Sequence, residues 1–252
     1  MSALDQKWPQ EIIIVRHGQS AGNVARDAAE AAGHAVIDVA TRDCDVPLSE
    51  LGERQASALG EWLKDNHQAP SAVFTSPYLR SQQTTTLALR TAGFSPDSVI
   101  VDERLREKEF GILDGITIAG IAQRYPEQAQ IRKRVGKFYF RPPGGESWCD
   151  VILRLRSMID TFTREYRGER LLIVSHQVVV LCFRYLLERL TEQQILRIDR
   201  AGDVANCAVT SYAFNPALEH GKLALEHYNF VAPLLEERAE VTGKPDVPIA
   251  PK

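Results

Sequence analysis

Two histidines of this chain follow short apolar runs, and the residues around them suit phosphate chemistry. His17 comes two residues after the run at 12–15, and His176 comes two residues after the run at 171–174. Four aliphatic residues bounded by polar ones are typical of buried strands, and open α/β sheets bind ligands beyond the carboxyl ends of their strands. We therefore expect the two histidines to face a single site.

These residues could transfer a phosphoryl group. A neutral imidazole nitrogen of His17 can attack phosphorus in line, while the guanidinium groups of Arg16 and Arg80 match the non-bridging oxygens. Arg80 follows a Ser-Pro pair at 76–77, which suits the N-cap and the first position of a helix. Its side chain would then lie at the positive end of that helix, and His176 would complete the anion pocket.

A second chemistry competes for the same segment. The residues Gly-Gln-Ser-Ala-Gly at 18–22 match the nucleophile elbow of serine hydrolases, with Ser20 as the nucleophile and His176 as its base. An elbow serine needs an oxyanion loop from an earlier strand, and the eleven residues before Ile12 suggest no such element. Phosphorus chemistry is therefore favoured over a serine hydrolase.

The elements that must position these side chains alternate between strand and helix patterns, which predicts an α/β fold. Strands are predicted at 12–15, 72–75, 99–101, 171–174, 207–214 and 223–228. Helices are predicted at 21–32, from Ser49 past Leu63, from 76 to 92, at 116–125, from Ser147 to Gly168, and at 178–190. We expect one domain over 1–252, with a covering insertion at about 102–146 and a tail after about 229.

Composition fits this view. With 252 residues, of which 44% are hydrophobic, the folded chain would bury roughly three-quarters of its unfolded surface. A formal charge of −3 gives no global attraction to nucleic acid or to an anionic membrane. No stretch approaches the ~20 apolar residues of a bilayer span, and the first eleven residues do not resemble a targeting signal. Four cysteines without a close pair indicate reduced thiols, so we expect a cytoplasmic protein.

Three segments carry a specific combination of residues: Val-Arg-His-Gly-Gln-Ser at 15–20 with Asn23, Thr-Ser-Pro-Tyr-Leu-Arg at 75–80, and Val-Ser-His at 174–176. In this order, over about 12–214, the chain resembles the histidine phosphatase superfamily, which includes the cofactor-dependent phosphoglycerate mutases. The resemblance implies a phosphoglycerate mutase-like, three-layer α/β/α sandwich around a mostly parallel mixed sheet.

The resemblance also implies roles for site residues. His17 resembles the histidine that is phosphorylated, and the phosphate pocket would comprise Arg16, Asn23, Arg80 and His176. The proton donor would lie in Leu-Arg-Glu-Lys-Glu-Phe-Gly at 105–111, because an alkoxide leaving group needs an acid. Its spacing to the glycine favours Glu107, and Glu109 is the alternative.

The acceptor of the phosphoryl group decides the reaction, since water gives a phosphatase and a retained substrate gives a mutase. Gln177 stands where phosphoglycerate mutases would have glycine, which favours a phosphatase and makes Gln177 a candidate phosphate ligand. His-Gln at 176–177 resembles the bisphosphatase domain that acts on fructose 2,6-bisphosphate, and Arg141 matches one of its contacts. Gly144 and Ile118 stand where that domain would have Lys and Tyr, so this substrate is not adopted.

The sequence thus predicts a phosphatase for a small phosphorylated metabolite that uses no metal or cofactor. A mutase and a phosphate-binding module without turnover are the alternatives, and the oligomeric state stays open. A basic segment at 124–141 could attract a polyanionic substrate or could form a solvated helix face. Aromatic residues follow its cations, but no repeat or module indicates nucleic-acid binding.

Overall fold

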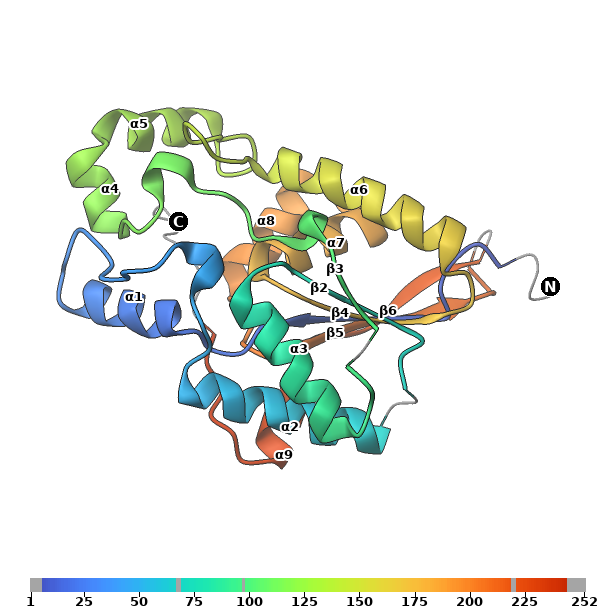
Figure 1. The fold of residues 1–252 in the computed structure, drawn as a ribbon. Helices are drawn as coiled ribbons and strands as arrows, with labels where there is room; N and C mark the ends of the chain where they lie inside the picture. The colour runs from blue at the N-terminus through green and yellow to red at the C-terminus, as the bar shows by residue number, and fades with distance from the viewer. Residues whose placement is uncertain (1–5, 67–68, 97, 219–220, 244–252) are drawn as a thin grey trace.

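The computed structural model describes residues 6–66, 69–96, 98–218 and 221–243, and it is built around one six-stranded sheet (Figure 1). The strands lie in the order β3-β2-β4-β1-β5-β6, in which β5 runs antiparallel to both neighbours and the other pairs are parallel. Their bounds are β1 Glu11–Arg16, β2 Ala72–Thr75, β3 Val99–Val101, β4 Arg170–Ser175, β5 Val209–Asn215 and β6 Lys222–Phe230.

Helices cover both faces of the sheet (Figure 1). Alternate residues of β1 point to opposite faces, so Ile12 and Ile14 join one core while Ile13 and Val15 join the other. One face carries α6 (Trp148–Glu165), α7 (Gln177–Leu187) and α8 (Glu192–Ala201), and the other carries α2 (Glu50–Asn66), α3 (Leu79–Ala92) and α9 (Ala232–Glu236). The predicted α/β/α sandwich with a mostly parallel mixed sheet is confirmed.

The remaining helices gather at the end of the sheet where β1 and β4 finish (Figure 1). They are α1 (Ala21–Ala31), α4 (Ile118–Arg124) and α5 (Pro126–Val135), with the short 3-10 helices η2 (Asp43–Asp45), η3 (Glu103–Leu105) and η4 (Gly111–Leu113). A small separate core of Leu113, Ile116, Ile121 and Phe140 holds the segment around α4 together.

One predicted helix start is wrong. Helix α3 begins at Leu79 with Tyr78 as its N-cap, rather than at the Ser-Pro pair. The hydroxyl of Ser76 lies 2.8 Å from Nε2 of His176, so the site uses it instead. Helices α5, α8 and α9 had no prediction of their own, and from residue 244 onward the Pro-containing tail lies outside the described residues. Among the described helices, none combines the length and apolarity that a membrane span requires.

Candidate active site

The parallel pairing of β1 and β4 brings the two predicted histidines together. Arg16 and Ser175 are register partners at the strand ends, and the backbone N–H of His17 donates to the carbonyl of Ser175 at 2.9 Å. The rings of His17 and His176 are fully buried, with centroids 5.1 Å apart and planes inclined by 66°. The single site expected from the two apolar runs therefore exists in the fold.

The hydrogen bonds of His17 define its tautomer. Its Nδ1 lies 2.6 Å from the carbonyl oxygen of Gly18, and because that oxygen can only accept, Nδ1 carries the proton. The lone pair is then on Nε2, which accepts from Nε of Arg80 at 3.1 Å. The nitrogen able to act as a nucleophile thus faces a buried guanidinium group.

Arg80 is also held by a residue that the sequence reasoning missed. The carboxylate of Asp43, in η2, pairs with the Arg80 guanidinium at 3.1 Å, and the Asp43 carbonyl accepts from it at 2.6 Å. Asp43 lies in an irregular segment without periodicity, so no sequence pattern indicated that it would contact Arg80. The Arg80 side chain is 1% exposed, so its charge is shared between His17 and Asp43 within the protein.

Three buried side chains fix the loop after β1. Thr84, one turn beyond Arg80 in α3, accepts from the N–H of Gly18 at 3.0 Å. Asn206 donates its amide to the carbonyl of His17 at 2.9 Å, and Gln55 accepts from the N–H of Gln19 at 2.8 Å. Sequence reasoning missed these residues too, because each comes from a different distant element.

The same network extends to the end of the described chain. Nε2 of Gln55 donates to the carbonyl of Glu240 at 2.7 Å and to the hydroxyl of Thr242 at 2.9 Å. Asn206 donates its N–H to the carbonyl of Thr242 at 2.7 Å. Residues 240–242 are thereby tied, through two buried amides, to the backbone of His17 and Gln19.

His176 lies among hydroxyl groups and one aromatic ring. Its Nε2 is 2.8 Å from the Ser76 hydroxyl and 3.4 Å from that of Ser81, while the Tyr78 ring centroid lies 5.0 Å from its own. Tyr78 donates to the carboxylate of Glu109 at 2.8 Å, and burial, reinforced by that carboxylate, raises the pKa of Tyr78. The Tyr78 hydroxyl therefore stays protonated and acts as a donor.

Of the two acid candidates, Glu107 is buried and Glu109 reaches the surface. Glu107 is 2% exposed, and its carboxylate accepts from the N–H of Lys108 at 2.8 Å and faces the N–H of Val178, in the first turn of α7, at 3.5 Å. The side chain of Glu109 is 45% exposed and bonds Tyr78. The geometry therefore brings Glu107, rather than Glu109, to the helix that begins beside His176.

Helix α6 braces the loop that carries Glu107. Arg154 donates to the carbonyl of Glu107 at 3.2 Å and pairs with Glu146 at 3.1 Å. Glu146 in turn pairs with Arg106 at 2.6 Å and accepts from the N–H of Glu109 at 3.1 Å. Glu146 is therefore a support for the loop that carries Glu107.

Other predicted residues lie in local structural contacts. Asn23 and Ser20 form the capping box of α1, in which each side chain accepts from the other's backbone N–H. Gln177 donates its amide to Asp203 at 2.9 Å. The exposed Arg141 pairs with Asp150, which closes the N-terminal cap of α6. The structure brings together His17, His176 and Arg80, with Glu107 beside the first turn of α7 and Arg16 at the end of β1.

The basic segment splits into two kinds of residue. Lys133 and Arg134 are exposed on α5, as expected of a solvated helix face, whereas Lys137 pairs with Asp199 at 2.6 Å. The buried Lys108 lies nearby, with its ammonium nitrogen 4.1 Å from the Phe110 ring centroid, and burial lowers its pKa to about 8. Among the described residues, no three His, Cys, Asp or Glu side chains cluster as metal ligands.

Fold and site together define an α/β protein with two facing histidines and a buried arginine at the end of a parallel sheet, an arrangement suited to anions. A sequence model of the histidine phosphatase superfamily (branch 1) matches residues 12–229, and the chain belongs to this superfamily. The resemblance inferred from three short segments is confirmed.

Relatives include both mutases and phosphatases. A 2,3-bisphosphoglycerate-dependent phosphoglycerate mutase of Rhizobium meliloti is 32% identical over 77% of this chain and 86% of its own. A 6-phosphofructo-2-kinase/fructose-2,6-bisphosphatase of Caenorhabditis elegans is 33% identical over 69% of this chain and 33% of its own.

Solved structures show the same fold. A mycobacterial glucosyl-3-phosphoglycerate phosphatase, solved with inorganic phosphate, is 25% identical with a TM-score of 0.67, over 89% of this chain and 99% of its own. A phosphoglycerate mutase of Bacillus anthracis, 20% identical with a TM-score of 0.68 over 93% of this chain and 98% of its own, supports the fold alone.

Proposed function

We propose that this protein hydrolyses phosphomonoesters through a phosphohistidine formed on His17. The observation that carries the proposal is the geometry of that imidazole: Nδ1 is held by the Gly18 carbonyl at 2.6 Å, and Nε2 faces the Arg80 guanidinium at 3.1 Å. A nucleophile with a defined tautomer beside a buried cation suits attack on a phosphate that the same cation binds.

The mechanism has two displacements. Nε2 of His17 attacks phosphorus and the ester bond breaks, while Arg80 and Arg16 stabilise the charge on the non-bridging oxygens. The leaving oxygen takes the proton of Glu107, whose carboxyl group must be protonated at this point. Water then attacks the phosphohistidine, Glu107 recovers a proton from it, and phosphate leaves. The burial of Glu107 beside α7 supports this assignment over Glu109.

The first test measures phosphate release from 4-nitrophenyl phosphate in the presence of a chelator, together with trapping of acid-labile phosphoenzyme. The wild type should give both, and His17→Ala should give neither. Ser20→Ala is the control, since Ser20 caps α1 and the variant should still form phosphoenzyme. Esterase activity that depends on Ser20 would instead support the serine hydrolase alternative.

The acid is tested by the leaving group. In Glu107→Gln, hydrolysis of an alkyl phosphate should fall far more than that of 4-nitrophenyl phosphate, whose leaving group needs no proton. Glu109→Gln is the matched control and should affect both substrates alike. Equal losses for both substrates in Glu107→Gln would contradict the role of Glu107.

A phosphoglycerate mutase is the second candidate, and the sequence similarity to the Rhizobium meliloti mutase favours it. Gln177, in the position where mutases would have glycine, supports the phosphatase instead. Incubation with 3-phosphoglycerate and 2,3-bisphosphoglycerate separates the two functions. A mutase yields 2-phosphoglycerate with the total of esterified phosphate unchanged, whereas a phosphatase forms no 2-phosphoglycerate and releases phosphate from 4-nitrophenyl phosphate.

A further inference from the structure

We propose that the cavity beside Asp43 binds the leaving group of the substrate, and that this group is an alcohol with an apolar part and a hydrogen-bond donor, preferably an ammonium group, close to the ester oxygen. The inference rests on the proposed phosphomonoesterase function and names its substrate class. It concerns Gly22 and residues of two segments, 36–46 and 112–125, none of which is a predicted catalytic group.

The cavity has the size and the position for a leaving group. Its volume is about 460 Å³, which falls within the usual range of small-molecule sites. Asp43 lines it and is also the partner of Arg80, which bonds His17, so cavity and nucleophile are separated by two side chains in direct contact. A phosphate held by Arg80 would therefore carry its ester group towards this cavity.

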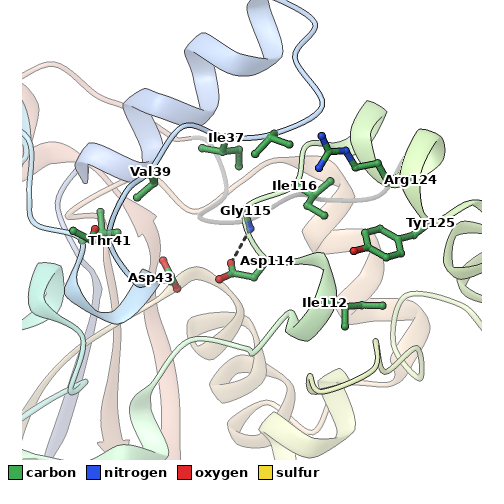
Figure 2. Close-up of a pocket in the computed structure, with 13 residues that line it drawn as sticks. Ile37, Val39, Thr41, Asp43, Ile112, Asp114, Gly115, Ile116, Arg124 and Tyr125 are labelled. Atoms are coloured by element: carbon green, nitrogen blue, oxygen red, sulfur yellow. Dashed lines mark hydrogen bonds between the residues drawn. The ribbon is translucent and has the colours of Figure 1, made fainter.

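The cavity wall is of mixed character, with aliphatic side chains from both segments beside polar ones (Figure 2). Ile37 and Val39 come from one segment and Ile112 and Ile116 from the other, and the Tyr125 ring lies at one end. The wall is built by backbone pairing: Ile37 donates its N–H to the carbonyl of Gly115 at 2.9 Å, and Val36 forms a bridge with Ile116. The aliphatic side chains gain free energy by covering an apolar part of a ligand, and the polar groups beside them can bind its donors.

The end nearest to Arg80 is acidic. The carboxylates of Asp43 and Asp114 both line this part of the cavity (Figure 2), and Glu109 lies close enough for its charge to act on Asp114. Burial, and then the charge of Asp43, raise the pKa of Asp114, so adding a further anion here is unfavourable. A leaving group with its own carboxylate or second phosphate at this end is disfavoured.

Phosphate binding makes the need for a donor stronger. Asp43 is paired with Arg80, and a substrate phosphate competes for the same guanidinium group. The two terminal nitrogens of Arg80 are the ones that bond Asp43, so turning either of them to the phosphate takes a donor from Asp43, whose carboxylate then faces the leaving group. An ammonium or hydroxyl group on the carbon next to the ester carbon would replace the donor that Asp43 loses. Arg124 lies at the opposite end of the cavity from Asp43, beside Ile116 (Figure 2).

A matched series of phosphomonoesters tests the inference. The parent is 3-phenylpropyl phosphate, and its three relatives carry an ammonium, hydroxyl or carboxylate group at carbon 2. We expect kcat/KM to fall from the ammonium ester through the hydroxyl ester and the parent to the carboxylate ester, with the first and last separated by at least about 100-fold. A carboxylate ester hydrolysed as well as the ammonium ester would overturn the inference.

Two variants assign the selectivity to the cavity. Asp114→Asn removes the charge and keeps the shape, so the preference for ammonium over carboxylate should shrink by about tenfold. Asp38→Asn is the matched control: Asp38 is exposed on the same segment and does not line the cavity, so the preference should persist. An unchanged preference in folded Asp114→Asn would contradict the role of the acidic end.

The aliphatic side chains of the wall are tested separately. Ile112→Ser changes a side chain that is 42% exposed, and it should lower kcat/KM for 3-phenylpropyl phosphate more than for ethyl phosphate. Equal effects on both would overturn the apolar part of the inference. Release of phosphate from 4-nitrophenyl phosphate monitors the proposed function itself. If that release occurs and depends on His17, a failed ranking refutes only the substrate class; if it does not occur, the phosphatase function fails first.

Discussion

The phosphate pocket and the leaving-group cavity meet at Asp43 but are built in opposite ways. His17, Arg80 and His176 are almost fully buried, and they come from strand ends and a helix start that the central sheet positions. The cavity is lined by irregular segments and a short helix end, and its residues Val36 and Ile112 are about 40% exposed.

The difference follows from what each part must do. Displacement at phosphorus depends on the placement of a few atoms, and rigid, buried elements with satisfied hydrogen bonds can hold them. Selection among leaving groups needs only a complementary surface, which loops can supply and vary without disturbing the sheet. Damage to the phosphate pocket should therefore affect all substrates, whereas damage to the cavity should affect the choice between them.

The largest effect is expected for Arg80→Ala. The variant loses the donor to Nε2 of His17 and the cation that binds the phosphate, so kcat should fall by roughly 100- to 1,000-fold, by analogy with the loss of one oxyanion donor. The loss should be similar for 4-nitrophenyl and alkyl phosphates in steady-state assays. A loss below about tenfold, or one confined to bulky esters, would contradict the role of Arg80 in the phosphate pocket.

The same contrast explains what the sequence alone could predict. The strands that precede His17 and His176 could be predicted because a four-residue apolar run bounded by polar residues is typical of a buried strand. Parallel neighbours then bring their ends together, so the histidine pair followed from local pattern and one topological rule. The burial of Glu107 could not be predicted, since it depends on the support of Arg154, in the distant helix α6, and of Glu146, in the segment just before that helix.

The cavity could not be predicted for a related reason. Asp43 and Asp114 are far apart in the sequence, and loop backbone with no periodicity brings them together. The charges along the sequence indicated instead a basic segment at 124–141, but in the structure Lys137 of this segment pairs with Asp199. The start of α3 was misplaced because Ser76, a good capping residue, contacts His176.

Two glycines allow a matched test of the two regions. A Cβ on Gly52 would lie 2.0 Å from the carbonyl oxygen of Gln19, and one on Gly120 would lie 1.9 Å from that of Ala35. Gly52→Ala must therefore displace the loop after His17, and a shift of that kind can cost about 100-fold in kcat on any substrate. Gly120→Ala displaces the cavity wall, so 4-nitrophenyl phosphate should be hydrolysed nearly as before while the ammonium preference is lost.

Steady-state kinetics of Gly52→Ala and Gly120→Ala, on 4-nitrophenyl phosphate and on the ammonium and carboxylate esters, check this prediction. Gly202→Ala is the control, because its Cβ would meet nothing within 4 Å and its backbone, at φ 165°, is extended. The comparison fails if Gly120→Ala lowers kcat on 4-nitrophenyl phosphate as much as Gly52→Ala does.

A smaller effect is expected where the chain end supports the phosphate pocket. Gln55→Leu breaks the link between Gln19 and residues 240–242, so kcat should fall by about tenfold for every ester, with the ammonium preference intact. Thr242→Val removes only one of these hydrogen bonds and should cost less. Ser57→Ala, on the exposed side of the same helix, is the control for stability. A change in preference would show that the link acts on the cavity instead.

The smallest effect concerns the stability cost of a cation near the phosphate pocket. Burial lowers the pKa of Lys108 from 10.5 to about 8, so the folded state disfavours its charged form. That cost is fully present below pH 8 and disappears as the pH rises towards 10.5, where the unfolded chain also loses the proton. Lys108→Met should therefore raise Tm by a few degrees at pH 7, and the gain should shrink between pH 8 and 10.5. Calorimetry of both proteins across this range checks the sign, and a gain that does not depend on pH would mean that packing, rather than charge, makes Lys108 costly. The exposed Lys133→Met on α5 supplies the matched control, because its charge is solvated in the folded protein.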